Sequence, residues 1–397
     1  MIDIFIEGGR TLIDGEIVET SLRIDDGKIQ TIDASSGHGA LNLDGRHLLV
    51  MPGIVDLHGD AFERQMMPRP GVGFPIDVAL LESDRQAISN GITTVFHAPT
   101  WSWEPGLRSG DNAARLLEAI ERLRPLFKTD TRFHLRHETY NLDAEDGISH
   151  WLLEGRIDLL AFNDHMESTA AILDNPRKRH RMIERTGLSS EAFDGLVEHV
   201  LSRAYAVPNS ITRLAQAANA AGIRMLSHDD ESPAMRKAFR ERGVKIAEFP
   251  VNEETAREAA TGGDAIVFGA PNVVRGASHT GWTKASDMIE KGLCSVLASD
   301  YYYPAPILAA FRLAADDVLP LAQAWELISA APARAAGLAD RGVLAQGHRG
   351  DLLLVDDALP QRPRIVAVIA AGQLAYLADA DRLNTSLPAL CEPLAAE

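Results

Sequence analysis

The segment VMPGIVDLHGD, residues 50–60, decides how this chain is interpreted. It is an apolar run that ends in His58 and Asp60, which are two positions apart. Side chains at positions i and i+2 of an extended strand point to the same face of the strand. We therefore expect the imidazole of His58 and the carboxylate of Asp60 to emerge together at the carboxyl end of a strand. Such a pair forms half of a metal site.

Length, charge and cysteine content narrow the class of protein. The chain has 397 residues, which suits a large barrel with a small accessory domain. Its formal net charge is −17, and an acidic protein is a poor general binder of nucleic acid or of anionic membranes. The two cysteines, Cys294 and Cys391, give neither a disulfide framework nor a CxxC metal site.

No targeting or membrane signal is visible in the sequence. The first residues lack the basic segment of a signal peptide, and no apolar run reaches the length of a membrane span. We therefore expect a cytoplasmic protein that does not associate with membranes. Both a monomer and a homo-oligomer are compatible with the sequence.

The two ends of the chain share a pattern of short strands and tight turns, in residues 1–50 and 342–385. In the first of them, Asp26-Gly27 is a hairpin signal between the β-like segments Leu22–Ile24 and Ile29–Ile32. Neither end alone has enough strands to bury a sheet face. We therefore expect the two ends to form one small β-sandwich domain.

Residues 51–341 alternate short apolar runs with helical patterns, such as Asn112–Leu123 and Ser210–Ala220. This alternation indicates a parallel sheet. We predict strands near residues 50–57, 93–98, 132–138, 157–162, 223–227, 244–249, 265–269 and 294–299. Eight strands close a (β/α)8 TIM-type barrel, which is the predicted α/β fold. The connection between 98 and 132 is long enough for one further short strand.

Metal-binding side chains end five of the eight predicted strands. A barrel places its active site at the carboxyl ends of its strands, so these side chains are expected to meet there. The candidate metal ligands are His58, Asp60, Glu138, His165, His228 and Asp300. Nitrogen and oxygen ligands without thiolates suit Zn²⁺ best and also fit Mn²⁺, Fe²⁺, Co²⁺ or Ni²⁺.

Each candidate also has a purely structural interpretation. A buried histidine is more often a hydrogen-bonded core residue than a ligand, and this holds most for His97 and His134, which lie within predicted strands. Asp300 also fits the N-cap of a following helix. The repeated placement at strand ends favours a role in function for His58, His228 and Asp300.

Arginines near the predicted strand ends indicate a phosphorylated small-molecule substrate. The candidates are Arg64, Arg69, Arg136 and Arg275, with His279 as a further donor. The planar guanidinium group matches two phosphate oxygens at once. The alternative is that these arginines pair with Asp and Glu, which the chain has in excess.

Several of these motifs resemble the amidohydrolase superfamily: the chain-end strands, the pattern Pro-Gly-apolar-Asp-x-His-x-Asp at residues 52–60, and Ala298-Ser299-Asp300. Members of that family usually carry His-x-His where this chain has His58 and Asp60. The resemblance implies two divalent metal ions bridged by one side chain. It also implies an aspartate on the eighth strand that is both a metal ligand and a proton shuttle, here Asp300.

Matched to this sequence, the family pattern makes Glu138 the bridging residue, and His165 and His228 the ligands of the second ion. Residues 67–72 (MPRPGV) and 269–279 (GAPNVVRGASH) are similar to the phosphonate-metabolism branch of the superfamily. Members of that branch hydrolyse a ribose 1-alkylphosphonate 5-triphosphate and release pyrophosphate. The resemblance implies that a metal-activated hydroxide cleaves the phosphoanhydride while Asp300 accepts the proton.

The sequence leaves two alternatives open. His137 and residues 280–284 depart from the pattern of that branch, so the substrate is not fixed by the resemblance. An amidohydrolase that cleaves a C–N bond in an N-acyl compound or a cyclic amide would use the same metal centre. A non-catalytic metal-dependent binding protein would be expected to have a broken ligand set, whereas here the set is intact.

Overall fold

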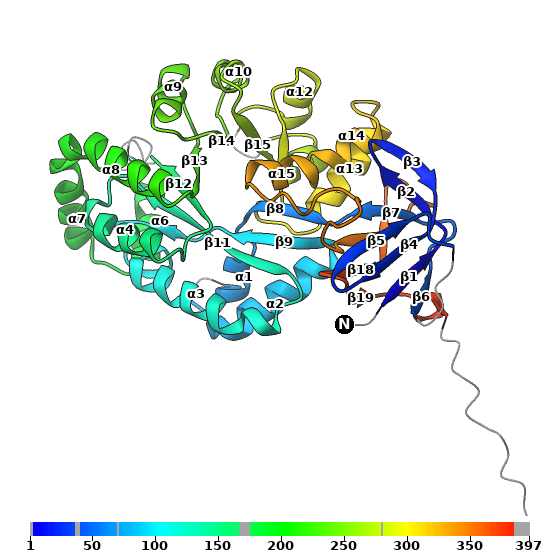
Figure 1. Ribbon diagram of the computed structural model, residues 1–397. Coiled ribbons are helices and arrows are strands. Elements are labelled where there is room, and N and C mark those ends of the chain that lie inside the picture. Colours follow the sequence, from blue (N-terminus) through cyan, green and yellow to red (C-terminus); the bar gives the residue numbers. More distant parts are fainter. Residues whose placement is uncertain are drawn as a thin grey trace, which may run out of the picture. The chain divides into compact units, whose positions relative to one another are not determined.

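A computed structural model describes residues 3–35, 40–69, 71–164, 166, 175–278 and 281–384 of the chain. The chain divides into two compact units, one formed by Met1–Gly53 together with Asp340–Glu397 and the other by Ile54–Ala339. Figure 1 follows the chain through both. Each unit has its own apolar core.

The unit built from the chain ends contains two sheets, with strand orders β20-β6-β1-β4-β5 and β19-β18-β17-β7-β2-β3. The first sheet comprises β1 (Ile4–Glu7), β4 (Leu22–Asp25), β5 (Lys28–Ile32), β6 (Leu41–Asp44) and β20 (Leu383–Asn384). The second comprises β2 (Arg10–Ile13), β3 (Glu16–Glu19), β7 (Leu49–Pro52), β17 (Leu352–Asp356), β18 (Arg364–Ala370) and β19 (Gln373–Leu377).

Alternate residues of these strands form the core between the sheets. Ile4 and Ile6 of one sheet and Leu352 and Leu354 of the other belong to the same buried cluster, as the two-residue period of a strand requires. The predicted hairpin is confirmed, because β4 and β5 pair antiparallel around the left-handed residues Asp26 and Gly27 (φ +48° and +75°). The fold prediction for the chain ends, a small β-sandwich, is therefore confirmed.

One glycine contact in this unit gives a testable prediction. Gly372 has φ +70°, and a Cβ atom there would lie 2.5 Å from the Cα atom of Gly27. Gly372→Ala is expected to lower the free energy of unfolding by about 2–3 kcal/mol, because left-handed strain adds to overpacking against rigid backbone. Urea unfolding measures the change.

The control for this prediction is Gly347→Ala. Gly347 has φ +83°, and a Cβ atom there would have nothing within 4 Å. This variant is expected to lose only the contribution of the left-handed backbone, about 1 kcal/mol. Equal losses in the two variants would show that the approach of Gly27 to Gly372 does not limit stability.

In the described part of the second unit, eight parallel strands form a nearly closed barrel in the order β16-β15-β14-β13-β12-β11-β9-β8. These strands are β8 (Ile54–Gly59), β9 (Ile92–His97), β11 (Asp130–Glu138), β12 (Leu159–Asn163), β13 (Arg224–His228), β14 (Ile246–Glu248), β15 (Ala265–Gly269) and β16 (Val296–Ala298). The long connection after residue 98 contains a short strand, β10 (Thr100–Trp101), which pairs with β11. The predicted (β/α)8 barrel is confirmed.

The first predicted strand, residues 50–57, is two strands. The run breaks at Gly53: β7 pairs with β17 and β2, and β8 pairs with β9. Both halves are equally buried, so the apolar pattern does not show where the chain passes from one sheet to another.

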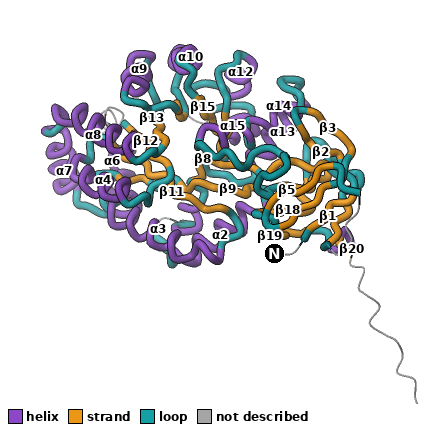
Figure 2. Tube along the Cα trace, in the orientation of Figure 1, coloured by secondary structure: helices purple, strands orange, loops and turns teal. Residues whose placement is uncertain are grey.

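Helices alternate with the barrel strands along the chain, as Figure 2 shows. They are α1 (Phe62–Met66), α2 (Ile76–Ser89), α3 (Gly110–Leu123), α4 (Glu145–Leu153), α6 (Pro176–Thr186), α7 (Ser190–Ser202), α8 (Val207–Ala220), α9 (Pro233–Glu241), α10 (Glu253–Thr261), α11 (Ala270–Arg275), α12 (Ala285–Glu290), α13 (Ala305–Ala315), α14 (Leu321–Glu326) and α15 (Ala330–Ala335). The predicted helices 112–123 and 210–220 are confirmed as α3 and α8. None of the helices in the described ranges has both the length and the apolar character of a membrane span.

Successive side chains of a barrel strand point alternately into the barrel and toward the surrounding helices, so they belong to two different apolar clusters. On β11, Phe133 and Leu135 pack in one cluster with Leu116 of α3 and Leu214 of α8. On β12 and β13, Ala161 and Leu226 belong to a different cluster, which includes residues of most barrel strands. The intervening positions of β11 are polar, and they face the same side as the candidate site residues described below.

Candidate metal centre

A cavity of about 420 Å³ lies at the carboxyl ends of the barrel strands. Six of the side chains singled out in the sequence line it: His58, Asp60, Arg136, Glu138, His228 and Asp300. His165 and His279 lie outside the described residues. The fold thus brings together side chains that are up to 242 positions apart in the sequence, from His58 to Asp300.

Closure of the barrel brings His58, Asp60 and Asp300 together. The backbone N–H of Asp300 donates to the carbonyl of His58 (2.9 Å), and the N–H of Asp60 donates to the carbonyl of Asp300 (3.0 Å). One ligand atom from each of the three side chains lies within 4.8 Å of the other two. Glu138 and His228 line the same cavity but are not in this three-residue cluster.

Three residues within two positions of the carboxyl ends of barrel strands have left-handed backbones. They are Asp229, Phe249 and Asp300, with φ of +58°, +57° and +55°. All three line the cavity. This conformation costs a residue with a Cβ atom about 1–2 kcal/mol. It lets two successive residues, such as His228 and Asp229, face the cavity, which a regular strand does not allow.

The hydrogen bonds of His58 fix its tautomer. Nη1 of Arg136 donates to Nε2 of His58 (2.9 Å), so Nε2 is an acceptor and the proton resides on Nδ1. That Nδ1–H donates to Glu248 (2.8 Å). Arg136 is anchored by two further bonds to the hydroxyl of Thr100, and its Nη1 lies 3.7 Å from Oδ2 of Asp60. A cationic group therefore already lies between His58 and Asp60.

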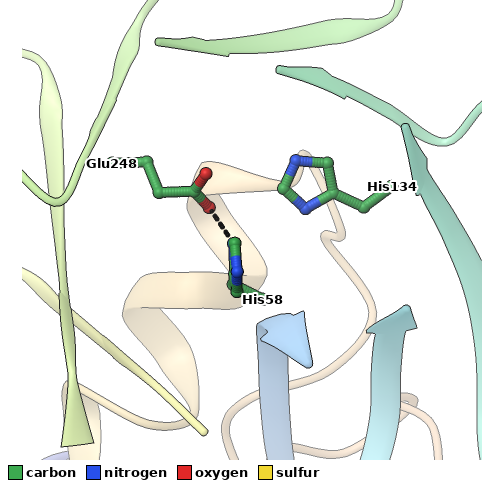
Figure 3. Close-up of side chains that lie close together, drawn as sticks. All are labelled: His58, His134 and Glu248. Atoms are coloured by element: carbon green, nitrogen blue, oxygen red, sulfur yellow. Dashed lines mark hydrogen bonds and ion pairs between the residues drawn. The ribbon is translucent and has the colours of Figure 1, made fainter. Parts of the chain in front are cut away.

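Glu248 is a site residue that the sequence analysis missed. It is fully buried at the end of β14 and also accepts from Nδ1 of His228 (2.8 Å). Figure 3 shows its carboxylate and the ring of His134 both turned toward His58. Glu248 is the next-to-last residue of the predicted strand 244–249 and the last residue of the observed β14, so its position near a strand end was the signal that could have found it.

His134 belongs to a second cluster, in which ligand atoms of His58, His134 and Glu248 lie within 4.8 Å of one another. Its Nδ1 donates to the carbonyl of Leu57 (2.9 Å). Burial lowers the pKa of His134 to about 4, so the ring is neutral at pH 7. The neutral Nε2 is then an acceptor, which has no hydrogen-bond donor among the described residues.

The predicted phosphate-binding arginines occupy different places. Arg136 lies in the cavity, whereas Arg64, Arg69 and Arg275 are exposed. The guanidinium of Arg64 lies over the ring of Tyr301 at 5.6 Å, and Arg275 donates to the Tyr301 hydroxyl at 3.5 Å; Tyr301 lines the cavity. Arg69 does not line the cavity in the described structure. Arg108, which the sequence analysis missed, does.

The charge of the cavity fits a divalent cation. Five carboxylates and two guanidinium groups are among the described residues that line it, namely Asp60, Glu104, Glu138, Asp229 and Asp300 against Arg108 and Arg136. Burial, together with the neighbouring Asp60, raises the pKa of Asp300 to about 6. A divalent cation held by His58, Asp60 and Asp300 would offset this excess of negative charge, and one imidazole with two carboxylates is a ligand set that Zn²⁺ accepts.

Aromatic side chains are also part of the lining of the cavity. They include Trp103, Phe249, Phe268 and Trp282, and Met182 and two prolines line it as well. Trp282 is 48% exposed, so its indole is available for contact with a ligand. The lining of the cavity therefore combines charged and apolar side chains.

A comparison with known protein families decides the affiliation of the chain. Residues 49–381 match the model of the amidohydrolase family. The chain belongs to the amidohydrolase family. The resemblance that the sequence motifs indicated is therefore confirmed, and the chain is a hydrolytic enzyme.

Known relatives and solved structures are consistent with this affiliation. The chain is 32% identical over 362 residues to alpha-D-ribose 1-methylphosphonate 5-triphosphate diphosphatase of Escherichia coli (strain K12), which covers 88% of this chain and 94% of that protein. Its fold is similar to that of 5-methylcytosine deaminase from Klebsiella pneumoniae (TM-score 0.64, 15% identity, 95% and 98% of the two chains). It is also similar to N-isopropylammelide isopropylaminohydrolase from Burkholderia multivorans (TM-score 0.63, 19% identity, 94% and 98%).

Proposed function

We propose that this chain is a metal-dependent diphosphatase that cleaves a phosphoanhydride bond in the 5-triphosphate of a ribose 1-alkylphosphonate and releases pyrophosphate. The observation that carries the proposal is the diphosphatase relative, whose similarity extends over 88% of the chain. The cavity supports it, since its candidate metal ligands, Arg136 and Arg108 surround one space.

The proposed metal centre holds two divalent ions. His58 and Asp60 would hold one ion, His165 and His228 would hold the other, and Glu138 would be a ligand shared by both. When bound, the ions lower the pKa of a water molecule toward neutrality and offset the charge of the phosphates. Zn²⁺ is the first candidate for this ligand set, which Mn²⁺, Fe²⁺, Co²⁺ and Ni²⁺ also fit.

Asp300 is the proposed proton acceptor. Its carboxylate lies in the cluster with His58 and Asp60, and burial raises its pKa to about 6. A base with a pKa near the working pH both accepts a proton from the attacking water and delivers it onward. Asp300 thus activates the nucleophile. Arg136, which in the structure bonds His58 and Thr100, adds a positive charge near the position where charge develops on the phosphate oxygens.

Arginines beside Tyr301 support a polyphosphate as the substrate. Arg64 and Arg275 both contact Tyr301, so two guanidinium groups gather beside the cavity. Each guanidinium offers a planar pair of donors to phosphate oxygens. We propose that they hold the part of the triphosphate that leaves. Arg69 and His279 remain predicted contacts of the same phosphates.

The aromatic lining residues favour a second candidate function, hydrolysis of a C–N bond in an N-acyl or cyclic amide compound. Trp103, Phe268 and Trp282 suit a ring or an alkyl group better than a phosphate. The same ligand cluster and the same proton acceptor would serve this reaction.

An activity comparison tests the two candidates. Purified protein is analysed for bound metal and then assayed against a ribose 1-methylphosphonate 5-triphosphate and a panel of N-acyl and cyclic amide compounds. We expect pyrophosphate from the first substrate, no turnover of the panel, and loss of activity after treatment with a chelator. His228→Ala is expected to lower kcat/KM by at least about 100-fold, because it removes a metal ligand.

The same substitution at the exposed His150 of α4 is the control, and it should leave activity unchanged. Turnover of the amide panel alone would overturn the phosphoanhydride assignment in favour of the second candidate. Full activity of His228→Ala would remove His228 from the metal centre.

A further inference from the structure

We propose that Glu248 is a positioning residue that holds two metal-binding histidines, His58 and His228, in the tautomer that presents Nε2 to the ions. The inference rests on the proposed function only in taking these histidines as metal ligands. It does not depend on which substrate is hydrolysed.

The geometry around Glu248 is symmetrical. Oε1 accepts from Nδ1 of His58 and Oε2 accepts from Nδ1 of His228, both at 2.8 Å. The two imidazole rings lie nearly parallel, with an interplanar angle of 16° and centroids 5.5 Å apart. One carboxylate therefore fixes the orientation of both rings.

Phe249 restrains the same two rings from another direction. Its phenyl ring meets His58 at 70° and His228 at 80°, with centroids 5.0 and 5.3 Å apart. Successive residues of a strand point to opposite faces, but the left-handed backbone of Phe249 lets it and Glu248 both face the histidines. Glu248 and Phe249, at the end of β14, thus both contact the two histidine rings and restrain their orientation.

The hydrogen bonds determine which ring nitrogen is available to a cation. A carboxylate only accepts, so both Nδ1 atoms must carry protons. In the neutral ring a proton on Nδ1 leaves Nε2 unprotonated, which is the form that binds a metal ion. In the structure Nε2 of His58 accepts from Arg136 and Nε2 of His228 lies 3.6 Å from Oδ2 of Asp229, so both nitrogens face the charged lining of the cavity. Because the proposed centre assigns the two histidines to different ions, Glu248 links the ligand geometry of one ion to that of the other.

The variant Glu248→Gln distinguishes two possible roles of Glu248, which are to orient the histidines and merely to fill space. The amide has nearly the same shape, but it offers one accepting oxygen and a donating nitrogen. It can therefore accept from only one of the two Nδ1–H groups, and the other histidine must change its tautomer or turn away. If Glu248 only filled space in the wild type, the Glu248→Gln variant would bind metal as well as the wild type does.

The experiment measures metal binding by the full-length protein with Co²⁺ as the probe. For Glu248→Gln we expect a Kd for Co²⁺ about 10–100-fold higher than in the wild type, the effect typical of a lost outer-sphere partner. At saturating Co²⁺ we expect the same number of ions per chain but a shifted visible absorption spectrum, because one imidazole has changed its orientation.

The matched control is Asp84→Asn. Asp84 of α2 is also a buried carboxylate, and it accepts from the backbone N–H groups of Lys128 and Thr129. This variant is expected to lose stability while the Kd and the spectrum of bound Co²⁺ stay as in the wild type. A readout that needs no variant is ¹⁵N NMR of the metal-free wild type, where His58 and His228 should both show the Nδ1–H tautomer.

Different outcomes separate the inference from the proposed function. An unchanged Kd and spectrum in Glu248→Gln, or an Nε2–H tautomer of either histidine in the wild type, would overturn the positioning role. Loss of one ion per chain at saturation would also overturn it, because Glu248 would then be a ligand itself. A wild type that binds no Co²⁺ would overturn both, whereas metal binding without pyrophosphate release would remove only the proposed substrate.

Discussion

Asp300→Asn is expected to lower kcat/KM by about 1,000-fold, within the range that a positioned general base contributes. The amide keeps the shape of the side chain and an oxygen that can bind a metal ion, but it does not accept a proton from water. Asp300 lies with His58 and Asp60 in one cluster, and burial raises its pKa to about 6. Steady-state kinetics with metal content measured on the same sample checks the result.

Asp317→Asn is the control for the backbone of Asp300. Both residues have φ +55°, and Asp317 is exposed beyond the end of α13. Asparagine tolerates this conformation, so the control should retain activity. If Asp300→Asn stays within 10-fold of the wild type with its metal still bound, another group accepts the proton.

Strand ends of the barrel were predictable because two features of the sequence coincide there, an apolar run and a polar side chain that can bind a metal ion. The run at residues 50–60 is apolar, and a polar metal-binding side chain follows it at once. The same combination locates His228 and Asp300, whereas Glu138 ends a strand in which polar and apolar residues alternate; all three line the cavity. The rule depends only on barrel geometry, in which every parallel strand ends at the same rim.

Partners of these side chains were not predictable in the same way. The bond from His58 to Glu248 joins residues 190 positions apart, and the bond from Arg136 to His58 joins residues 78 positions apart. Arg136 was predicted as a phosphate ligand, but in the structure its guanidinium bonds a candidate metal ligand. A pattern along the chain shows which face a side chain occupies, whereas its partner depends on strands that meet only after folding.

The placement of residue 249 illustrates a second limit. Two-residue alternation predicts that Phe249 points away from the face of Glu248. The left-handed backbone at Phe249 reverses this, and so does that at Asp229 beside His228. Aspartate tolerates this conformation, but phenylalanine rarely adopts it, so the local sequence gives no signal for the change at residue 249. The strain is located where the cavity is formed, which is where surrounding contacts over-determine the backbone.

Arg236→Met is expected to lower the free energy of unfolding by about 3–5 kcal/mol, the effect typical of breaking a buried ion pair. Arg236 is completely buried, and its guanidinium donates to Asp230 (3.1 Å) and to the carbonyl of Val244 (2.6 Å). Its Nε also lies 3.3 Å from the buried carboxylate of Asp264. Methionine fills a similar volume but leaves Asp230 without its cation and the carbonyl without a donor.

The Arg236→Met substitution is also expected to disturb the cavity and to weaken metal binding there. Arg236 of α9 bonds Ser227 of β13 and the carbonyls of Val244 and Ile246 around β14. These two strands end in His228 and Glu248, so loosening them should weaken metal binding as well as stability. Arg257→Met, which removes an exposed pair with Glu253, is the control and should leave the unfolding transition unchanged. Equal stability of the two variants in urea would mean that the desolvation of the buried cluster cancels its attraction, so that Arg236 specifies how β13 and β14 pack without adding to their stability.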